Sequence, residues 1–134
     1  MSSAPDASAL NIDLWPRAKF ESDAITPLSI LRKQAALLGE KTQQLVTAEV
    51  SSDASSNRVT HYFKLVVSVL DNYKYQLFYV SHKIDQLYPV TGFADGNFHP
   101  SLDDQTAFVD WLRAVLSSES TLKKIDSLMA QAKS

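Results

Sequence analysis

Residues 58–84 read RVTHYFKLVVSVLDNYKYQLFYVSHKI, and this stretch decides the fold of the 134-residue chain. Valine, tyrosine, phenylalanine and threonine, the residue types enriched in strands, fill both halves. Between the halves, Asp71-Asn72 is a turn signal, because both side chains can bond to nearby backbone and tolerate left-handed conformations. The pattern predicts two long antiparallel strands, residues 58–70 and 73–84, joined as a hairpin.

The length of the turn decides which side chains share a face, because alternate residues of a strand point to opposite sides. With an even-numbered loop, one face would form an apolar core under the helices. This predicted core face consists of Val59, His61, Phe63, Leu65, Val67, Val69, Phe78, Val80, His82 and Ile84. The opposite face would be semi-polar and rich in tyrosine. It consists of Tyr62, Lys64, Val66, Ser68, Leu70, Tyr73, Tyr75, Leu77 and Tyr79. A loop of odd length would instead merge the tyrosines with the core face.

A helix is predicted before the hairpin, over residues 27–38. Thr26 can cap the free amides and Pro27 suits the first helical position. Apolar residues then recur at helical spacing, and Gly39 fits a left-handed stop. Residues 45–50 are predicted to form a strand, and the polar SSDASSN of residues 51–57 a loop.

After the hairpin, residues 88–91 are predicted to form a short strand and residues 92–101, GFADGNFHPS, a loop with two glycines and a proline. Asp103 or Asp104 can then cap a helix whose apolar stripe runs from residue 108 to 116. A last amphipathic helix follows over residues 122–129.

The sequence therefore predicts an α+β fold. We expect an antiparallel meander of three long strands, with one or two short ones, packed on one face by an N-terminal helix and two C-terminal helices. Residues 1–24 would form a partly disordered arm and residues 25–134 a single domain. Within the arm, residues 10–14 alternate like a short strand. The apolar side chains of the arm could lie across the tyrosine-rich face; they are Leu10, Ile12, Leu14, Trp15 and Phe20.

Composition excludes several classes of function. The chain has no cysteine, which removes disulfides, thiolate catalysis and Cys-type zinc sites. With a net charge of −2, the chain lacks the excess of basic residues typical of a nucleic-acid-binding protein. Asp103 and Asp104 lie at the predicted start of a helix, where their negative charge would repel a phosphate group. We expect no signal peptide, and the sequence has no apolar run of the ~20 residues needed to span a bilayer. We expect a cytoplasmic protein that binds neither membrane nor nucleic acid.

The histidines raise the question of a metal site. His61 and His82 would face each other across the hairpin if the turn had two residues, and Asp85 and His99 are further potential ligands. Histidines near the end of a sheet are more often hydrogen-bonded parts of the core, so we predict no metal and no cofactor. There is no HExxH, P-loop or GxGxxG motif, and no serine in a glycine-flanked elbow, so no catalytic residue is assigned.

Two functions remain. The first is a small non-enzymatic binding or adaptor protein, with a protein partner or a second copy of the chain docking on the aromatic sheet face. Tyrosine is frequent in such contacts, and the predicted partner-binding residues are Tyr62, Lys64, Tyr73, Tyr75 and Tyr79. The alternative is a small enzyme or ligand-binding domain with a pocket between the sheet and loop 92–101, near His61, His82 and His99. A concave pocket holding two histidines would favour the alternative, and a flat exposed tyrosine sheet would favour the adaptor.

Overall fold

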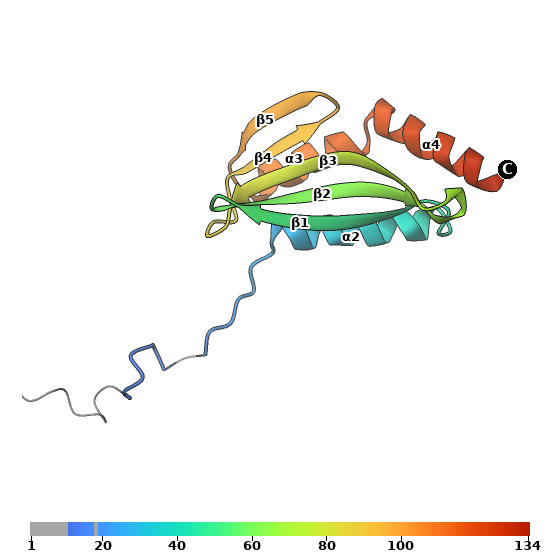
Figure 1. Ribbon diagram of the computed structural model, residues 1–134. Helices are drawn as coiled ribbons and strands as arrows, with labels where there is room; N and C mark the ends of the chain where they lie inside the picture. The colour runs from blue at the N-terminus through green and yellow to red at the C-terminus, as the bar shows by residue number, and fades with distance from the viewer. Residues whose placement is uncertain (1–10, 18) are drawn as a thin grey trace, which may run out of the picture.

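The computed structural model describes residues 11–17 and 19–134. Five antiparallel strands form one open sheet in the order β1-β2-β3-β4-β5 (Figure 1). Their bounds are Thr47–Ser55, Arg58–Val67, Tyr73–Lys83, Val90–Ala94 and Asn97–Leu102. Three helices pack against the sheet: α2 (Pro27–Lys41), α3 (Gln105–Leu116) and α4 (Glu119–Lys133). The predicted α+β fold is confirmed, including the helix before the sheet and the two after it.

Each helix begins at a residue that satisfies its free backbone amides. Thr26 and Ser29 form a reciprocal capping box at α2, Asp104 accepts from the amide of Ala107 at α3, and Ser118 caps α4. The predicted stop at Gly39 is wrong, since α2 continues to Lys41. Gly39 is buried within the helix, where an added Cβ would lie 2.9 Å from the oxygen of the flexible Gln44 side chain.

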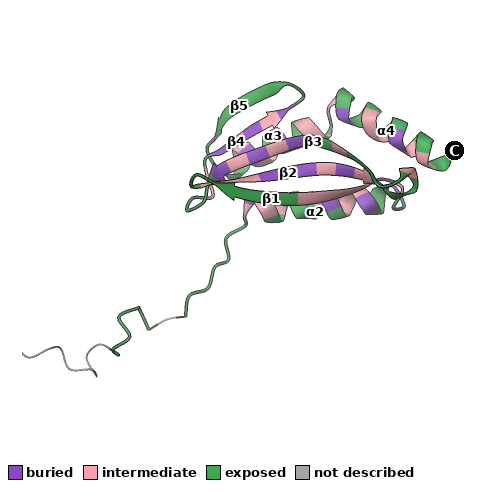
Figure 2. Ribbon diagram, in the orientation of Figure 1, coloured by how far each residue is buried: buried purple, intermediate pink, exposed green. Residues whose placement is uncertain are grey.

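The core lies between the helices and one face of β2, β3 and β4, where the buried residues concentrate (Figure 2). Phe63 and Phe78 stack with ring centroids 4.9 Å apart, and Trp111 meets Phe78 edge-on at 5.6 Å. Trp111 comes this close because it packs on Gly92, where an added Cβ would lie 2.6 Å from the indole. The predicted core face is mostly correct, but Val69 and Ile84 are exposed, because both lie beyond the paired part of their strands.

Two predicted loops are strands. Residues 51–55 continue β1 and pair with β2 as far as Ser55↔Arg58, so only Ser56 and Asn57 turn. Polar residues suffice there because β1 is an edge strand with an exposed half. Residues 92–101 are not a loop either. They contain most of the β4–β5 hairpin, whose turn is Asp95-Gly96 with both φ angles positive.

The turn between β2 and β3 has an odd number of residues, whereas the predicted faces require a turn of two or four. Strand pairing stops at Val67↔Tyr73, so five residues lie between the strands. They form a short 3-10 helix, η1 (Ser68–Leu70), followed by Asp71 and Asn72 with positive φ. Further along β3 the register shifts, because Lys64 pairs with Gln76 whereas Phe63 pairs with Phe78. Leu77 is the extra residue of a β-bulge, which restores the alternation that the odd loop had reversed.

The N-terminal arm does not cover the sheet. Its described residues, 11–17 and 19–25, lead away from the domain (Figure 1) and are exposed, and residues 11–14 form no strand. Leu14, Trp15 and Phe20 each expose most of their surface, and Trp15 contacts Phe20 edge-on with centroids 5.5 Å apart. The disorder predicted for residues 1–9 lies outside the described residues, as does Leu10. In the part of the chain that the structure describes, no helix is long and apolar enough to cross a membrane.

Candidate functional site

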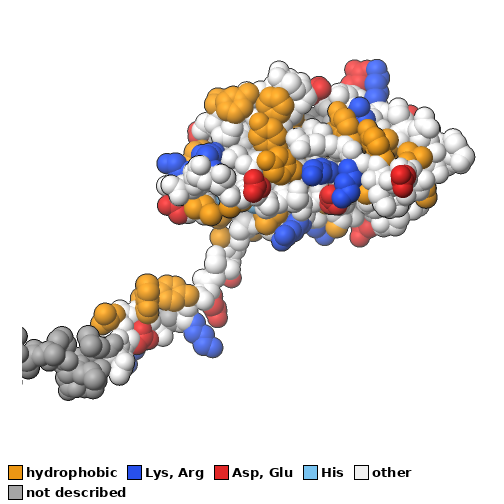
Figure 3. Space-filling view, in the orientation of Figure 1, with side chains coloured by type: hydrophobic (Ala, Val, Ile, Leu, Met, Phe, Trp, Pro, Cys, Tyr) orange, Lys and Arg blue, Asp and Glu red, His pale blue; other side chains and the backbone are white. Residues whose placement is uncertain are grey.

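The sheet face opposite the helices, called here the open face, carries a row of aromatic side chains. Tyr62 and Tyr79 are cross-strand partners with centroids 5.9 Å apart, and Tyr79 stacks on Phe93 at 5.3 Å. Phe98 pairs with Phe93 on the edge strand and is 62% exposed. These four residues, called the aromatic row, cross β2, β3, β4 and β5. Figure 3 shows hydrophobic side chains gathered on this face over these strands.

The other half of the open face is polar and charged. Lys64 follows Tyr62 on the same side of β2, and its ammonium lies 5.9 Å from the Tyr62 ring centroid. Lys74 and Glu49 form an ion pair of 3.0 Å across the sheet. Both partners are partly exposed, so the pair contributes little stability, but it gives the face an ordered charged edge next to the rings.

Of the five predicted partner-binding residues, Tyr62, Lys64 and Tyr79 lie together on the open face. Tyr73 and Tyr75 do not, because the odd loop pairs them with Val67 and Leu65 of the core face. Tyr75 is half-buried there, and the ammonium of Lys124 from α4 lies 4.2 Å from its ring centroid. Tyr73 is exposed at the end of the sheet.

Phe93 and Phe98 are not among the predicted partner-binding residues, because the sequence of residues 92–101 predicts a loop. The signal that could have found them is Asp95-Gly96, a frequent two-residue hairpin turn, with Phe93 and Phe98 at positions equally far from it. Pro100 argues against a central strand, so the sequence predicts a loop there. In the structure Pro100 lies in β5, an edge strand, where proline is tolerated.

His61 and His82 form a buried pair between the sheet and α2. They are not direct cross-strand partners, since His61 pairs with Val80, but their Nε2 atoms lie 3.1 Å apart. The Nδ1 of His82 lies 2.8 Å from two carbonyl oxygens, of Lys83 and Gln86. Carbonyls only accept, so this nitrogen carries the hydrogen. His82 Nε2 then accepts from His61, and His61 Nδ1 accepts from the Ser52 hydroxyl at 2.6 Å.

Ser52, His61 and His82 thus have the connectivity of a nucleophile, a base and a residue that orients the base. Such a base must hold a proton during the reaction. Burial, together with the neighbouring His82 and Arg32, lowers the pKa of His61 to about 4. The imidazolium is therefore disfavoured, and the arrangement suits a satisfied buried network better than proton transfer.

A hollow lies beside residues 94–99, but the histidine pair does not line it. A hollow of about 280 Å³ lies between β3, β5, α3 and α4, lined by Tyr75, Trp111 and Lys124 among others, and His99 is its one histidine. His61 and His82 are not part of its lining. Within residues 11–17 and 19–134, no three histidine, aspartate or glutamate side chains lie close enough together to hold a metal ion.

One buried polar atom in the described chain has no hydrogen-bond partner, the hydroxyl of Tyr88 just before β4. Burial, and to a lesser degree the carboxylate of Asp104, raises the pKa of this phenol. The hydroxyl therefore stays protonated, and the ring contributes to the core beside Phe108, with centroids 6.4 Å apart.

Searches for similar proteins add no family to this description: no family model, curated protein or solved structure matches the chain.

Proposed function

We propose that this chain is a small non-enzymatic cytoplasmic binding or adaptor protein, and that a protein partner docks on the open face. The observation that carries the proposal is the aromatic row. Its four rings are contiguous across four strands, and no described helix lies over them. Aromatic residues on a rigid sheet lose little conformational entropy on binding and dominate the energetics of protein interfaces.

The composition of the open face fits a protein partner better than other classes. Tyr62 and Tyr79 offer apolar rings with hydroxyls that can hydrogen-bond, and Lys64 lies beside them. The charged edge of Lys74 and Glu49 carries both signs, which suits a polar rim around an aromatic centre. A face that binds nucleic acid would instead need a surplus of cations.

The pocket beside β5 supports the binding function over the enzymatic alternative. A catalytic site was expected to bring two histidines together in a concave pocket, whereas the hollow holds His99 alone. The two other histidines are engaged in a closed hydrogen-bond network.

The test is affinity capture from the native host with three forms of the chain: the wild type, Tyr79→Ala and Tyr73→Ala. Tyr79 lies in the middle of the aromatic row, whereas Tyr73 is an exposed tyrosine outside it, so Tyr73→Ala is a matched control. Each captured protein is then purified and titrated with the three forms.

We expect one partner whose dissociation constant rises about tenfold or more with Tyr79→Ala and stays unchanged with Tyr73→Ala. If every captured protein binds the two variants equally well, the open face is not the docking site.

A further inference from the structure

A second surface of the molecule, on the helix side, is apolar and hollow. A groove of about 470 Å³ runs between α2 and α3 and reaches α4. Its floor is the core face of β2 and β3, and its walls are aliphatic; the lining includes Leu37, Phe63, Leu77, Leu116, Leu122 and Ile125. The volume falls in the range of sites that hold a bound ligand or several large side chains.

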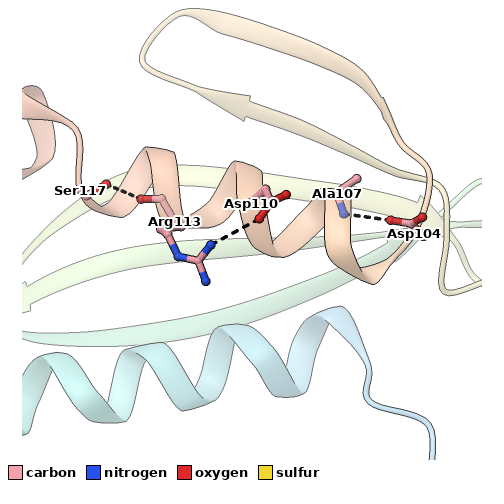
Figure 4. A network of polar contacts seen from close by, with 5 residues as sticks. All are labelled: Asp104, Ala107, Asp110, Arg113 and Ser117. Carbon is pink, nitrogen blue, oxygen red and sulfur yellow. Dashed lines mark hydrogen bonds and ion pairs between the residues drawn. The ribbon is translucent and has the colours of Figure 1, made fainter.

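Polar residues of the groove stand at its rim. Gln34 and Lys41 belong to α2, and Arg113 belongs to α3. Figure 4 shows Arg113 pointing from α3 toward α2, with its guanidinium 3.3 Å from the carboxylate of Asp110. An occupant of this groove should therefore be apolar where it enters the hollow and carry some negative charge at the rim.

The N-terminal arm has this chemistry. Of the ten large hydrophobic residues exposed in the described chain, five lie in the arm, namely Ile12, Leu14, Trp15, Phe20 and Ile25. Scattered exposed hydrophobics are ordinary, but such a concentration within one short segment marks a contact. Trp15 and Phe20 already contact each other and form one compact aromatic unit. The same segment carries three acidic groups, Asp13, Glu21 and Asp23, against two basic ones, Arg17 and Lys19.

In the structure the arm does not fold back onto its own copy, since its described residues are exposed. The capping box of Thr26 and Ser29 fixes the start of α2, and the residue before Pro27 is extended, with φ −90° and ψ 155°. These constraints direct the chain out of the N-terminal end of α2, and the described residues of the arm lead away from the domain (Figure 1). The groove runs from Ile30 toward Lys41, in the opposite direction along the helix.

We propose that the arm of one copy docks in the groove of a second copy, with Trp15 and Phe20 entering the hollow between α2 and α3. Two copies can exchange arms about a twofold axis, so that each copy gives one arm and receives one. This surface is distinct from the open face, so the dimer and the partner site proposed above can fail independently.

The first test measures the oligomeric state of the full chain by sedimentation over a wide concentration range. We expect a dimer. The double variant Trp15→Ala/Phe20→Ala should raise the dimer dissociation constant about tenfold or more, as should Leu122→Lys on the groove wall. Leu122 is 53% exposed on α4, so the lysine should not disturb folding. Arg17→Ala/Lys19→Ala, in the same arm, is the matched control and should leave the dimer intact.

The second test mixes the arm variant with the groove variant. The first keeps an intact groove and the second an intact arm, so the mixture can form one complete arm-groove contact. We expect heterodimers at concentrations where each variant alone is monomeric. Four results would overturn the proposal: a wild type that stays monomeric, a dimer insensitive to the arm variant, a dimer insensitive to Leu122→Lys, or a mixture without heterodimers.

Discussion

Lowering the pH from about 7.5 to about 5 should destabilise the fold through a single residue, His61, by about 2 kcal/mol. The residue is only 4% exposed, and its ring nitrogens bond to Ser52 and His82. Its pKa is lowered from 6.5 to about 4, first by burial and then by His82 and Arg32. The native state therefore holds His61 neutral over the whole pH interval.

The sign follows from proton binding. Below pH 6.5 the unfolded chain protonates this histidine, whereas the native chain does so only near pH 4. The unfolded state binds more protons in that window, so the free energy of unfolding falls as the pH falls. The contribution of His61 is fully present above 6.5 and is lost between 6.5 and 4. At pH 5 the loss has accumulated over about 1.5 pH units, and each unit is worth about 1.4 kcal/mol.

The assay is a series of urea melts of the wild type, His61→Gln and His99→Gln at both pH values. Glutamine cannot titrate, so His61→Gln should lose about 2 kcal/mol less than the wild type over the same interval. His99 is exposed on β5, and His99→Gln should follow the wild type. An NMR titration of the native chain should place the midpoint of His61 near 4. Equal losses in the wild type and His61→Gln would refute the reasoning.

Three further predictions concern packing and capping, and urea melts check each of them. Phe63→Ala should cost about 2 to 5 kcal/mol because Phe63 is buried in the core, whereas Thr60→Ala on the open face should cost less than about 1 kcal/mol; equal costs would contradict the face assignment. Gly92→Ala should destabilise the fold by about 1 to 3 kcal/mol because the new Cβ would lie 2.6 Å from the indole of Trp111, and a penalty that persists in Gly92→Ala/Trp111→Leu would disprove that cause. Asp104→Ala should cost about 1 kcal/mol because its carboxylate caps α3 at 2.8 Å from the amide of Ala107; Asp104→Asn should recover most of that loss, and no recovery would argue against a capping role.

Much of the fold could be predicted from the sequence because the signals were local. Thr26-Pro27 and Asp104 begin helices through hydrogen bonds to residues only a few positions away. The apolar alternation of β2 marks its core face directly, and Phe63 and Leu65 are buried as expected. Such signals depend on neighbouring residues alone, so they can be recognised in the sequence without the tertiary structure.

The extents of the edge strands could not be predicted in this way. Residues 51–55 are polar, and their strand conformation comes from pairing with β2 rather than from their own side chains. Pro100 lies in an edge strand, although proline usually indicates a loop. In both places a partner strand supplies the hydrogen bonds. Which strand becomes the partner depends on the tertiary structure and not on the local sequence. The sequence consequently predicts the aromatic row only in part, because Phe93 and Phe98 lie in a hairpin whose residues predict a loop.

The register of the central hairpin shows why the tyrosines were divided wrongly. An odd loop reverses the faces, so Tyr73 and Tyr75 join the core side. The bulge at Leu77 reverses them again, so Tyr79 returns to the open face beside Tyr62.

The residues at the bulge contact the helices. Leu77 lines the groove under α2 and α3, and the adjacent Phe78 is buried against Trp111 of α3. Two successive apolar side chains can turn to the same side only where a bulge interrupts the alternation. Those contacts join residues far apart in the sequence, and no pattern within residues 58–84 specifies them. A sequence pattern could therefore indicate that this hairpin has an aromatic face, but the odd turn and the bulge decide which tyrosines belong to it.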